Sequence, residues 1–180
     1  MAPTGAAINI EGTTIHTGLN IPVGNFGTDL PELSAQMKCS LRNTLSELKA
    51  IVIDEISMVS NILLYYVHDR LLDIFGRTDN APFAGLTVLT VGDLFQLPPI
   101  GAKPVYTESI NCWQNFAALW KLFKIAELTE VMRQRVDSRL IDLLNNIRIG
   151  KVTPEDESPL KSRFIEKNDV SYPHDALHIC

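Results

Sequence analysis

The sequence lacks any long hydrophobic run. Apolar stretches such as residues 50–53 and 86–91 fall far short of the roughly 20 residues that a membrane-spanning helix needs. The first residues have neither the basic start nor the apolar centre of a secretory signal. Hydrophobic residues make up 46% of the 180 positions and charged residues 21%, which is ordinary for a globular domain. We therefore expect an intracellular protein with no membrane segment.

Cysteine and positive charge are also scarce. Cys39, Cys112 and Cys180 form an odd set without Cys-x-x-Cys spacing, so neither a disulfide framework nor a zinc site is expected, and the thiols should be reduced and mostly packed. The net charge of -5 argues against a broad basic surface for nucleic acid. A narrow groove for one strand, built from a few donors and stacking side chains, remains compatible with it.

Two apolar segments predict neighbouring strands of a parallel sheet. Residues 50–53 and 86–91 are nearly continuous apolar runs, as in strands that are covered on both faces. Between them, residues 61–75 place apolar side chains at helical spacing, with Ser60 as the N-cap and Gly76 as the stop. A strand, a helix and a strand in this order form a crossover unit, which predicts an α/β fold.

The remaining segments predict more helices and one more strand. Residues 1–150 are assigned to one domain, and the polar tail 151–180 to a linker or to the start of a second domain. Helices are expected within residues 31–48, 112–120 and 138–149, and a third strand at residues 124–128.

Paired acids follow the first predicted strand. Asp54 and Glu55 come directly after it, and ligands of open parallel sheets bind outside the carboxyl ends of the strands. In nucleotide hydrolases one such carboxylate holds Mg²⁺ and its neighbour activates a water beside the terminal phosphate. An acidic helix start is the alternative, because Asp and Glu favour that end of the helix dipole. For an isolated pair the alternative would be the better interpretation.

A glutamine in a stiffened loop follows the second strand. Residues 92–99 read Gly-Asp-Leu-Phe-Gln-Leu-Pro-Pro, in which Gly92 permits a tight turn and the two prolines restrict the backbone after Gln96. A rigidly held glutamine can bond a phosphate oxygen or a water in line with it, and it loses that bond when the phosphate leaves. The alternative is a surface turn with a solvated glutamine.

An arginine near the last predicted helix is a third candidate. Arg133 could act as a finger on a γ-phosphate, because a guanidinium is planar and permanently charged. A solvated basic helix start explains an unsupported arginine equally well.

Together these strings resemble the petite-integration-frequency (Pif-type) DNA helicases, relatives of the RecD-like helicases of superfamily one. Four ordered strings between residues 2 and 150 carry the resemblance. They are residues 2–10 with 14–17, similar to motif Ia; residues 48–59, similar to the combined signature and Mg²⁺ motif; residues 92–99, similar to motif III; and residues 128–134 with 146–150, similar to motif IV and its helix.

The resemblance implies a RecA-like three-layer domain with a parallel central sheet, and ATP hydrolysis coupled to 5′-to-3′ unwinding of DNA. It also implies a role in DNA repair, recombination or telomere maintenance, in the nucleus or alternatively in the mitochondrion. Taken alone, Thr14 and His16 would be packed or capping residues. The implied roles are Mg²⁺ binding for Asp54, polarisation of the attacking water for Glu55, γ-phosphate contacts for Gln96 and Arg133, and single-strand contacts for Thr14 and His16.

The 180 residues depart from the family pattern in two respects, one of which is that the second motor domain expected after about residue 150 is absent. They contain no G-x-x-x-x-G-K-[ST] string, which binds the phosphates upstream of motif Ia in the family. We therefore expect an incomplete domain, without its first strand, that binds and hydrolyses ATP poorly by itself. Two alternatives are a truncated module that binds single-stranded DNA or a protein, and a clamp-loader-like ATPase. The latter explains Asp54 and Glu55 but not residues 92–99.

Overall fold

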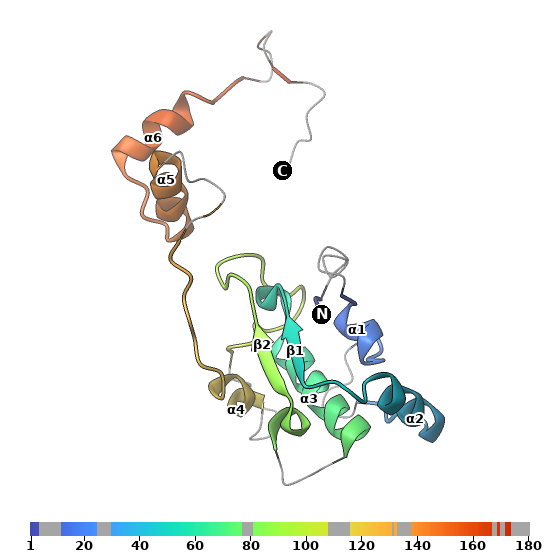
Figure 1. The fold of residues 1–180 in the computed structure, drawn as a ribbon. Helices are drawn as coiled ribbons and strands as arrows, with labels where there is room; N and C mark the ends of the chain where they lie inside the picture. Colours follow the sequence, from blue (N-terminus) through green and yellow to red (C-terminus); the bar gives the residue numbers. More distant parts are fainter. Residues whose placement is uncertain are drawn as a thin grey trace. The chain divides into compact units, whose positions relative to one another are not determined.

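The computed structural model describes residues 1–3, 12–24, 30–76, 81–107, 116–130, 132, 138–166, 169 and 172–173. The chain forms two compact units, Met1–Ala126 and Glu127–Cys180, and the domain boundary predicted near residue 150 stays a prediction. The first unit contains α1 (Ile15–Gly18), α2 (Ala35–Thr44), β1 (Ala50–Ile53), η2 (Ile56–Met58), α3 (Asn61–Phe75), η3 (Pro82–Gly85), β2 (Thr87–Thr90) and α4 (Phe116–Lys121) (Figure 1). The second unit contains α5 (Ser138–Arg148) and α6 (Pro154–Lys161).

β1 lies between β2 and the first residue of the chain. β1 and β2 pair in parallel, and the backbone N–H of Val91 extends the pairing by donating to the Ile53 carbonyl at 2.8 Å. On the opposite edge, the Met1 amino group donates to the Val52 carbonyl at 2.6 Å, and the Asp54 N–H donates to the Met1 carbonyl at 2.8 Å. Successive residues of a strand direct their backbone groups to opposite sides, so the two sets of bonds do not compete. The predicted α/β fold with a parallel sheet is confirmed.

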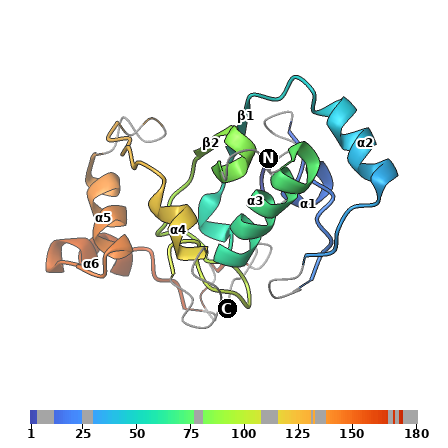
Figure 2. The same ribbon diagram turned by 90° about the horizontal axis from the view of Figure 1, so that it is seen from below.

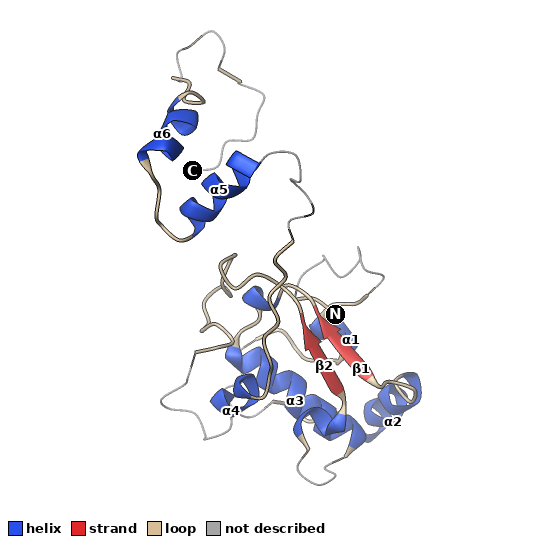
Figure 3. Ribbon diagram, turned by 60° about the vertical axis from the view of Figure 1, so that its left-hand side comes forward, coloured by secondary structure: helices blue, strands red, loops and turns tan. Residues whose placement is uncertain are grey.

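In the first unit the described helices cover one face of the sheet only. Ile51 and Ile53 point into the core, whereas Val52, Leu89 and Val91 are 44%, 55% and 41% exposed. The prediction that both strands are buried on both faces is therefore wrong for the residues described. Buried and exposed residues alternate along β1, and the apolar run in the sequence does not show this. The alternation follows from the position of the helices on one face of the sheet (Figure 3).

α3 is the central helix of this unit, and its predicted bounds are confirmed. The Ser60 hydroxyl accepts the Leu63 N–H at 3.0 Å and caps the start, and Gly76 ends the helix with a φ of 91°. Leu71 and Ile74 are fully buried in the same core as the sheet, and each such side chain contributes about 1.5–3 kcal/mol by burial. α2 and α4 pack on either side of α3 (Figure 2).

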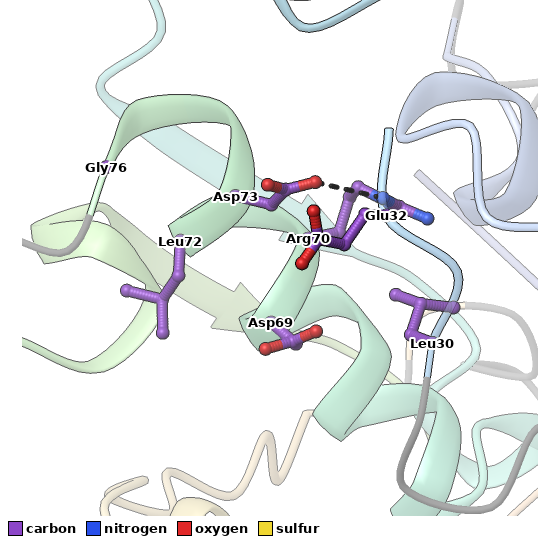
Figure 4. A pocket seen from close by; sticks show the side chains of 7 residues that line it. All are labelled: Leu30, Glu32, Asp69, Arg70, Leu72, Asp73 and Gly76. Carbon is purple, nitrogen blue, oxygen red and sulfur yellow. Dashed lines mark hydrogen bonds and ion pairs between the residues drawn. The ribbon is translucent and has the colours of Figure 1, made fainter. Parts of the chain in front are cut away.

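A cluster of charged side chains joins the C-terminal half of α3 to the segment before α2 (Figure 4). Arg70 is 2% exposed and donates to the Pro31 carbonyl at 2.9 Å and to Asp73 Oδ2 at 3.3 Å. Asp73 also accepts the Leu33 N–H at 3.2 Å and forms an ion pair with Lys38. We call these residues the Arg70 cluster. A cavity of about 330 Å³ lies beside it.

Three predictions outside this core need correction or extension. The strand expected at residues 124–128 is wrong, because this segment forms no regular element and Ile125 and Leu128 are 82% and 91% exposed. α4 begins at Phe116, and residues 112–115 of the predicted helix lie outside the described residues. Cys39 is exposed rather than packed. The helix predicted at residues 138–149 is confirmed as α5.

The polar tail contains a helix that the sequence interpretation missed. α6 begins with a capping box, in which the Asp156 carboxylate accepts the Thr153 N–H at 2.9 Å and the Thr153 hydroxyl accepts the Asp156 N–H at 3.3 Å. Asp156 also accepts a bond from Asn146 of α5 at 2.8 Å, so the two helices are joined. No helix among the described residues is long and apolar enough to cross a membrane.

Candidate functional site

The first strand ends in a sharp turn that carries the paired acids. Asp54 Oδ1 accepts the backbone N–H of Glu55 at 2.9 Å. Glu55 has φ 54° and ψ 48°, a left-handed conformation that costs a residue with a side chain about 1–2 kcal/mol. Such strain is concentrated at functional sites. Both carboxylates are half-buried, so they remain accessible to a ligand that approaches from solvent.

The loop after β2 holds Gln96 by means of the preceding aspartate. Asp93 Oδ1 accepts the Phe95 N–H at 3.1 Å, and the Asp93 carbonyl accepts the Gln96 N–H at 2.9 Å. The side-chain amide nitrogen of Gln96 donates to Asp93 Oδ2 at 3.4 Å. This contact uses the amide nitrogen as a donor, so the amide oxygen is the atom of the Gln96 side chain that can accept a hydrogen bond from a ligand. The Gln96 side chain is exposed.

The two loops meet at the carboxyl end of the sheet. The Ile56 N–H donates to the Val91 carbonyl at 3.0 Å, which ties the turn after β1 directly to the end of β2. Gly92, with a φ of 149°, lies so close that a Cβ there would be 2.8 Å from the Ile56 nitrogen. A larger residue would force the loops apart. The structure thus brings the segment of Glu55 and the segment of Gln96 into backbone contact.

Thr14 and His16 have structural partners in and beside α1. Thr14 caps this helix, accepting the Thr17 N–H at 3.2 Å and donating to the Thr17 hydroxyl at 2.8 Å. His16 Nδ1 lies 3.0 Å from the Ile21 carbonyl oxygen. The capping interpretation of Thr14 therefore describes its local contacts, and the expected single-strand role of both residues stays a prediction.

Two parts of the predicted site lie outside the described residues. They are Arg133 and residues 4–10 of the string similar to motif Ia. The expected contact of Arg133 with a phosphate stays a prediction.

Sequence reasoning missed Asp93 as the residue that orients Gln96. The signal available in the sequence was an aspartate directly after a glycine at a strand end, because aspartate is a typical turn former whose side chain bonds the backbone N–H groups that follow it.

The acids of the site do not form a complete metal cage. Among the described residues, no group of three or more His, Cys, Asp or Glu side chains is placed to hold a metal ion. Mg²⁺ is usually held by one or two carboxylates, with waters and substrate phosphates completing its octahedron. Asp54 has one carboxylate oxygen bonded to Glu55 and a second oxygen for a cation, so its surroundings fit a magnesium–nucleotide complex better than a free ion.

The chain is similar to known proteins of one family. The family model for PIF1-like helicases matches residues 1–158. The chain is 38% identical to the ATP-dependent DNA helicase RRM3 of Saccharomyces cerevisiae over 84% of its own length and 21% of the relative's. It is 36% identical to the ATP-dependent DNA helicase PIF1 of Emericella nidulans over 98% of its own length and 23% of the relative's. The chain therefore spans less than a quarter of these relatives.

Solved structures agree with this result. A crystal structure of Bacteroides Pif1 bound to single-stranded DNA matches 89% of this chain and 38% of the other, with a TM-score of 0.69 and 31% identity. A second, in complex with ADP-AlF3 and single-stranded DNA, matches 91% and 40%, with a TM-score of 0.65 and 32% identity. The fold is that of part of an α/β helicase domain, as the sequence predicted. The chain belongs to the PIF1-like helicase family.

Proposed function

We propose that this chain is the nucleotide-hydrolysing part of an ATP-dependent DNA helicase that moves 5′ to 3′ on a single strand and unwinds duplex DNA. The observation that carries the proposal is the backbone contact between the two loops at the carboxyl end of the sheet, one with paired acids and one with an oriented glutamine. The names of its relatives and the nucleotide and DNA in the Pif1 crystal structures support the same activity.

Asp54 is the proposed magnesium ligand. Mg²⁺ would neutralise charge on the phosphates of bound ATP. The Met1 carbonyl accepts the Asp54 backbone N–H, and the Glu55 N–H donates to the Asp54 carboxylate. The carboxylate is therefore already oriented before a nucleotide binds.

Glu55 is the proposed general base. Its carboxylate accepts a proton from the water that attacks the γ-phosphate, and the left-handed backbone at this position directs the side chain out of the strand. Gln96 bonds the γ-phosphate or the attacking water and responds when the phosphate leaves. Arg133 would approach the same phosphate.

Thr14 and His16 are proposed to contact the single strand. A role in DNA repair, recombination or telomere maintenance in the nucleus is part of the proposal and rests on the family resemblance of the sequence motifs. Because the 180 residues contain no G-x-x-x-x-G-K-[ST] string, we expect appreciable ATP hydrolysis only in a chain that also carries this loop upstream.

The test compares two substitutions in a chain that carries the upstream phosphate-binding loop. Glu55→Gln should lower DNA-stimulated ATP hydrolysis by at least about 100-fold, because a general base contributes roughly 10² to 10⁴ in rate. Glu47→Gln, at an exposed acid before β1, should leave the rate unchanged. Equal rates in the two variants would overturn the role of Glu55.

A further inference from the structure

The turn after β1 contains a buried hydroxyl group without a partner. Ser57 lies in η2, two residues after Glu55, and is 5% exposed. Its Oγ is buried and forms no hydrogen bond with any described residue. The large majority of buried polar atoms in proteins are bonded, because burial removes their bonds to water. An unpaired hydroxyl in the core opposes folding, so a serine at this position indicates a role other than stability.

The next buried serine shows the usual arrangement. Ser60 is 9% exposed, and its hydroxyl accepts the Leu63 N–H at 3.0 Å. The unpaired hydroxyl of Ser57 coincides instead with the left-handed backbone of Glu55, which is a second unfavourable feature of the same turn. Two such features beside the proposed general base point to the chemistry of this turn.

The backbone fixes the position of the Ser57 hydroxyl. The Ile56 N–H donates to the Val91 carbonyl at 3.0 Å, which holds the turn to the end of β2. The Met58 N–H donates to the Glu55 carbonyl at 3.0 Å and closes the turn around Ser57. A serine side chain rotates about a single bond, so its hydroxyl cannot reach a distant acceptor. The partner must be a mobile group that moves to the hydroxyl.

The Glu55 carboxylate meets this requirement. It is half-buried, and no hydrogen bond or ion pair joins it to another described residue. Its side chain is long and flexible and starts two residues from Ser57. An ionised carboxylate only accepts and a hydroxyl can donate, so the two groups are complementary, and a bond to an ionised acceptor is stronger than one between neutral groups. The Asp54 carboxylate differs, because it already accepts the Glu55 N–H at 2.9 Å.

We propose that Ser57 is a positioning residue for Glu55: when nucleotide is bound, its hydroxyl donates to one carboxylate oxygen and leaves the other oxygen directed at the attacking water. The second oxygen takes the proton of that water, and the hydroxyl keeps its own proton. A general base must be held within hydrogen-bond reach of the group that it deprotonates, and a further group that orients the base is a recurring part of such sites. The inference rests on the proposed role of Glu55 and adds the group that orients it.

The first experiment tests whether the hydroxyl is unpaired in the protein without nucleotide. Ser57→Ala removes the hydroxyl and little volume, so the 180-residue chain should unfold at a urea concentration at least as high as that of wild type. Ser46→Ala is the matched control, because the Ser46 hydroxyl is exposed and donates to the Asn43 carbonyl at 3.0 Å. It should not raise the midpoint. A lower midpoint for Ser57→Ala than for wild type would show that the hydroxyl already has a partner, and would overturn the inference.

The second experiment measures ATP hydrolysis in a chain that carries the upstream phosphate-binding loop. Ser57→Ala should lower kcat about tenfold, because a misplaced catalytic group can reduce the rate by up to roughly 100-fold. The KM for ATP should stay within about twofold of wild type, since the bond to Glu55 serves the hydrolysis step rather than nucleotide binding. Ser46→Ala should change neither quantity.

A double-mutant cycle then shows whether Ser57 acts through Glu55. In single-turnover hydrolysis, Ser57→Ala should have no further effect in a Glu55→Gln background, because the group that it orients is gone. The same loss in both backgrounds would mean a general structural effect and would overturn the inference. If Glu55→Gln lowers the rate and Ser57→Ala does not, the inference fails and the proposed function stands. If Glu55→Gln itself has no effect, both fail.

Discussion

The two ends of α3 use their polar side chains in opposite ways. In the Arg70 cluster, near the end of the helix, each charged group is bonded to another group of the protein: Arg70 to Asp73 and Pro31, and Asp73 to Lys38. Near the start of the helix, Glu55 is held in a strained backbone conformation and Gln96 is exposed. A cluster whose charges are paired stabilises the fold, whereas strained and exposed polar groups that are held in place are available to a ligand.

The comparison also shows that the density of charge does not identify a site. The Arg70 cluster is the denser of the two and has a cavity beside it, but its carboxylate Asp73 already has two cationic partners and a backbone N–H. The loops after β1 and β2 contain fewer charges, but their backbone is tied so that side chains extend from the carboxyl end of the sheet. The predictions below test whether one end serves stability and the other serves function.

The largest expected effect is the loss of Asp73. Asp73→Ala leaves the Arg70 guanidinium, which is 2% exposed in the wild type, with the Pro31 carbonyl as the remaining hydrogen-bond acceptor described for its terminal nitrogens, and an uncompensated buried charge is costly. We expect the free energy of unfolding to fall by about 3 kcal/mol in urea denaturation.

Lys38→Ala is the matched control. It removes the other cationic partner of Asp73, but the Lys38 side chain is 27% exposed, so the loss should stay below about 1 kcal/mol. If the two variants lose the same stability, the burial of Arg70 is not the cause.

The contribution of Asp73 should also depend on pH. Burial is the largest single influence on the pKa of Asp73, and it raises the pKa. The hydrogen bonds from Lys38 and from the Leu33 N–H, together with the charges of Lys38 and Arg70, lower it. Their sum outweighs burial, so the pKa lies below the ordinary 3.8. The unfolded chain therefore takes up this proton first. The stabilisation is present above pH 3.8 and is lost as the pH falls through the lower pKa of the folded state. Urea denaturation of wild type and Asp73→Ala should differ less at about pH 3 than at about pH 6.

A smaller effect is expected where the two site loops touch. Gly92→Ala places a methyl group 2.8 Å from the Ile56 nitrogen and forces a side chain into a φ of 149°. Unfolding in urea should show a loss of about 2 kcal/mol. Gly85→Ala, at the other end of β2, has a φ of 78° with nothing within 4 Å of the added carbon. It should lose only the backbone strain, about 1 kcal/mol. A smaller loss at Gly92 than at Gly85 would show that the loops can separate freely.

The sequence predicts those parts of this molecule that are determined locally. β1, α3 and α5 were predicted correctly because apolar spacing, an N-cap and a terminating glycine act within a few residues. The strand expected at residues 124–128 was wrong because its apolar residues have no partner strand among the described residues, and pairing is not a local property. α6 was missed because its polar residues and its prolines resemble a loop, although the capping box was present in the sequence.

The candidate site also has features that the sequence predicts and features that it does not. The positions of Glu55 and Gln96 follow from the general rule that parallel strands end at the same edge of a sheet. The left-handed backbone at Glu55 has no sequence signal, because hydrogen bonds from distant residues impose it on a residue that does not favour it. A pocket of about 290 Å³ between α1, the start of α3 and residues 100–102 could not be predicted either, since three segments distant in sequence form its walls.

The smallest expected effect concerns the strain at Glu55, and its sign distinguishes function from stability. Asparagine tolerates the left-handed region better than other residues with a side chain, so Glu55→Asn should raise the free energy of unfolding by up to about 1 kcal/mol. Glu55→Gln keeps the unbranched side chain and the strain, so its stability should match that of wild type. Both variants should lose ATP hydrolysis in a chain with the phosphate-binding loop. A stabilised but inactive Glu55→Asn would mean that the backbone is held in its unfavourable conformation for the sake of the carboxylate. If the asparagine and glutamine variants unfold at the same urea concentration, the turn after β1 carries no strain, and the contrast between the two ends of α3 rests on the Arg70 cluster alone.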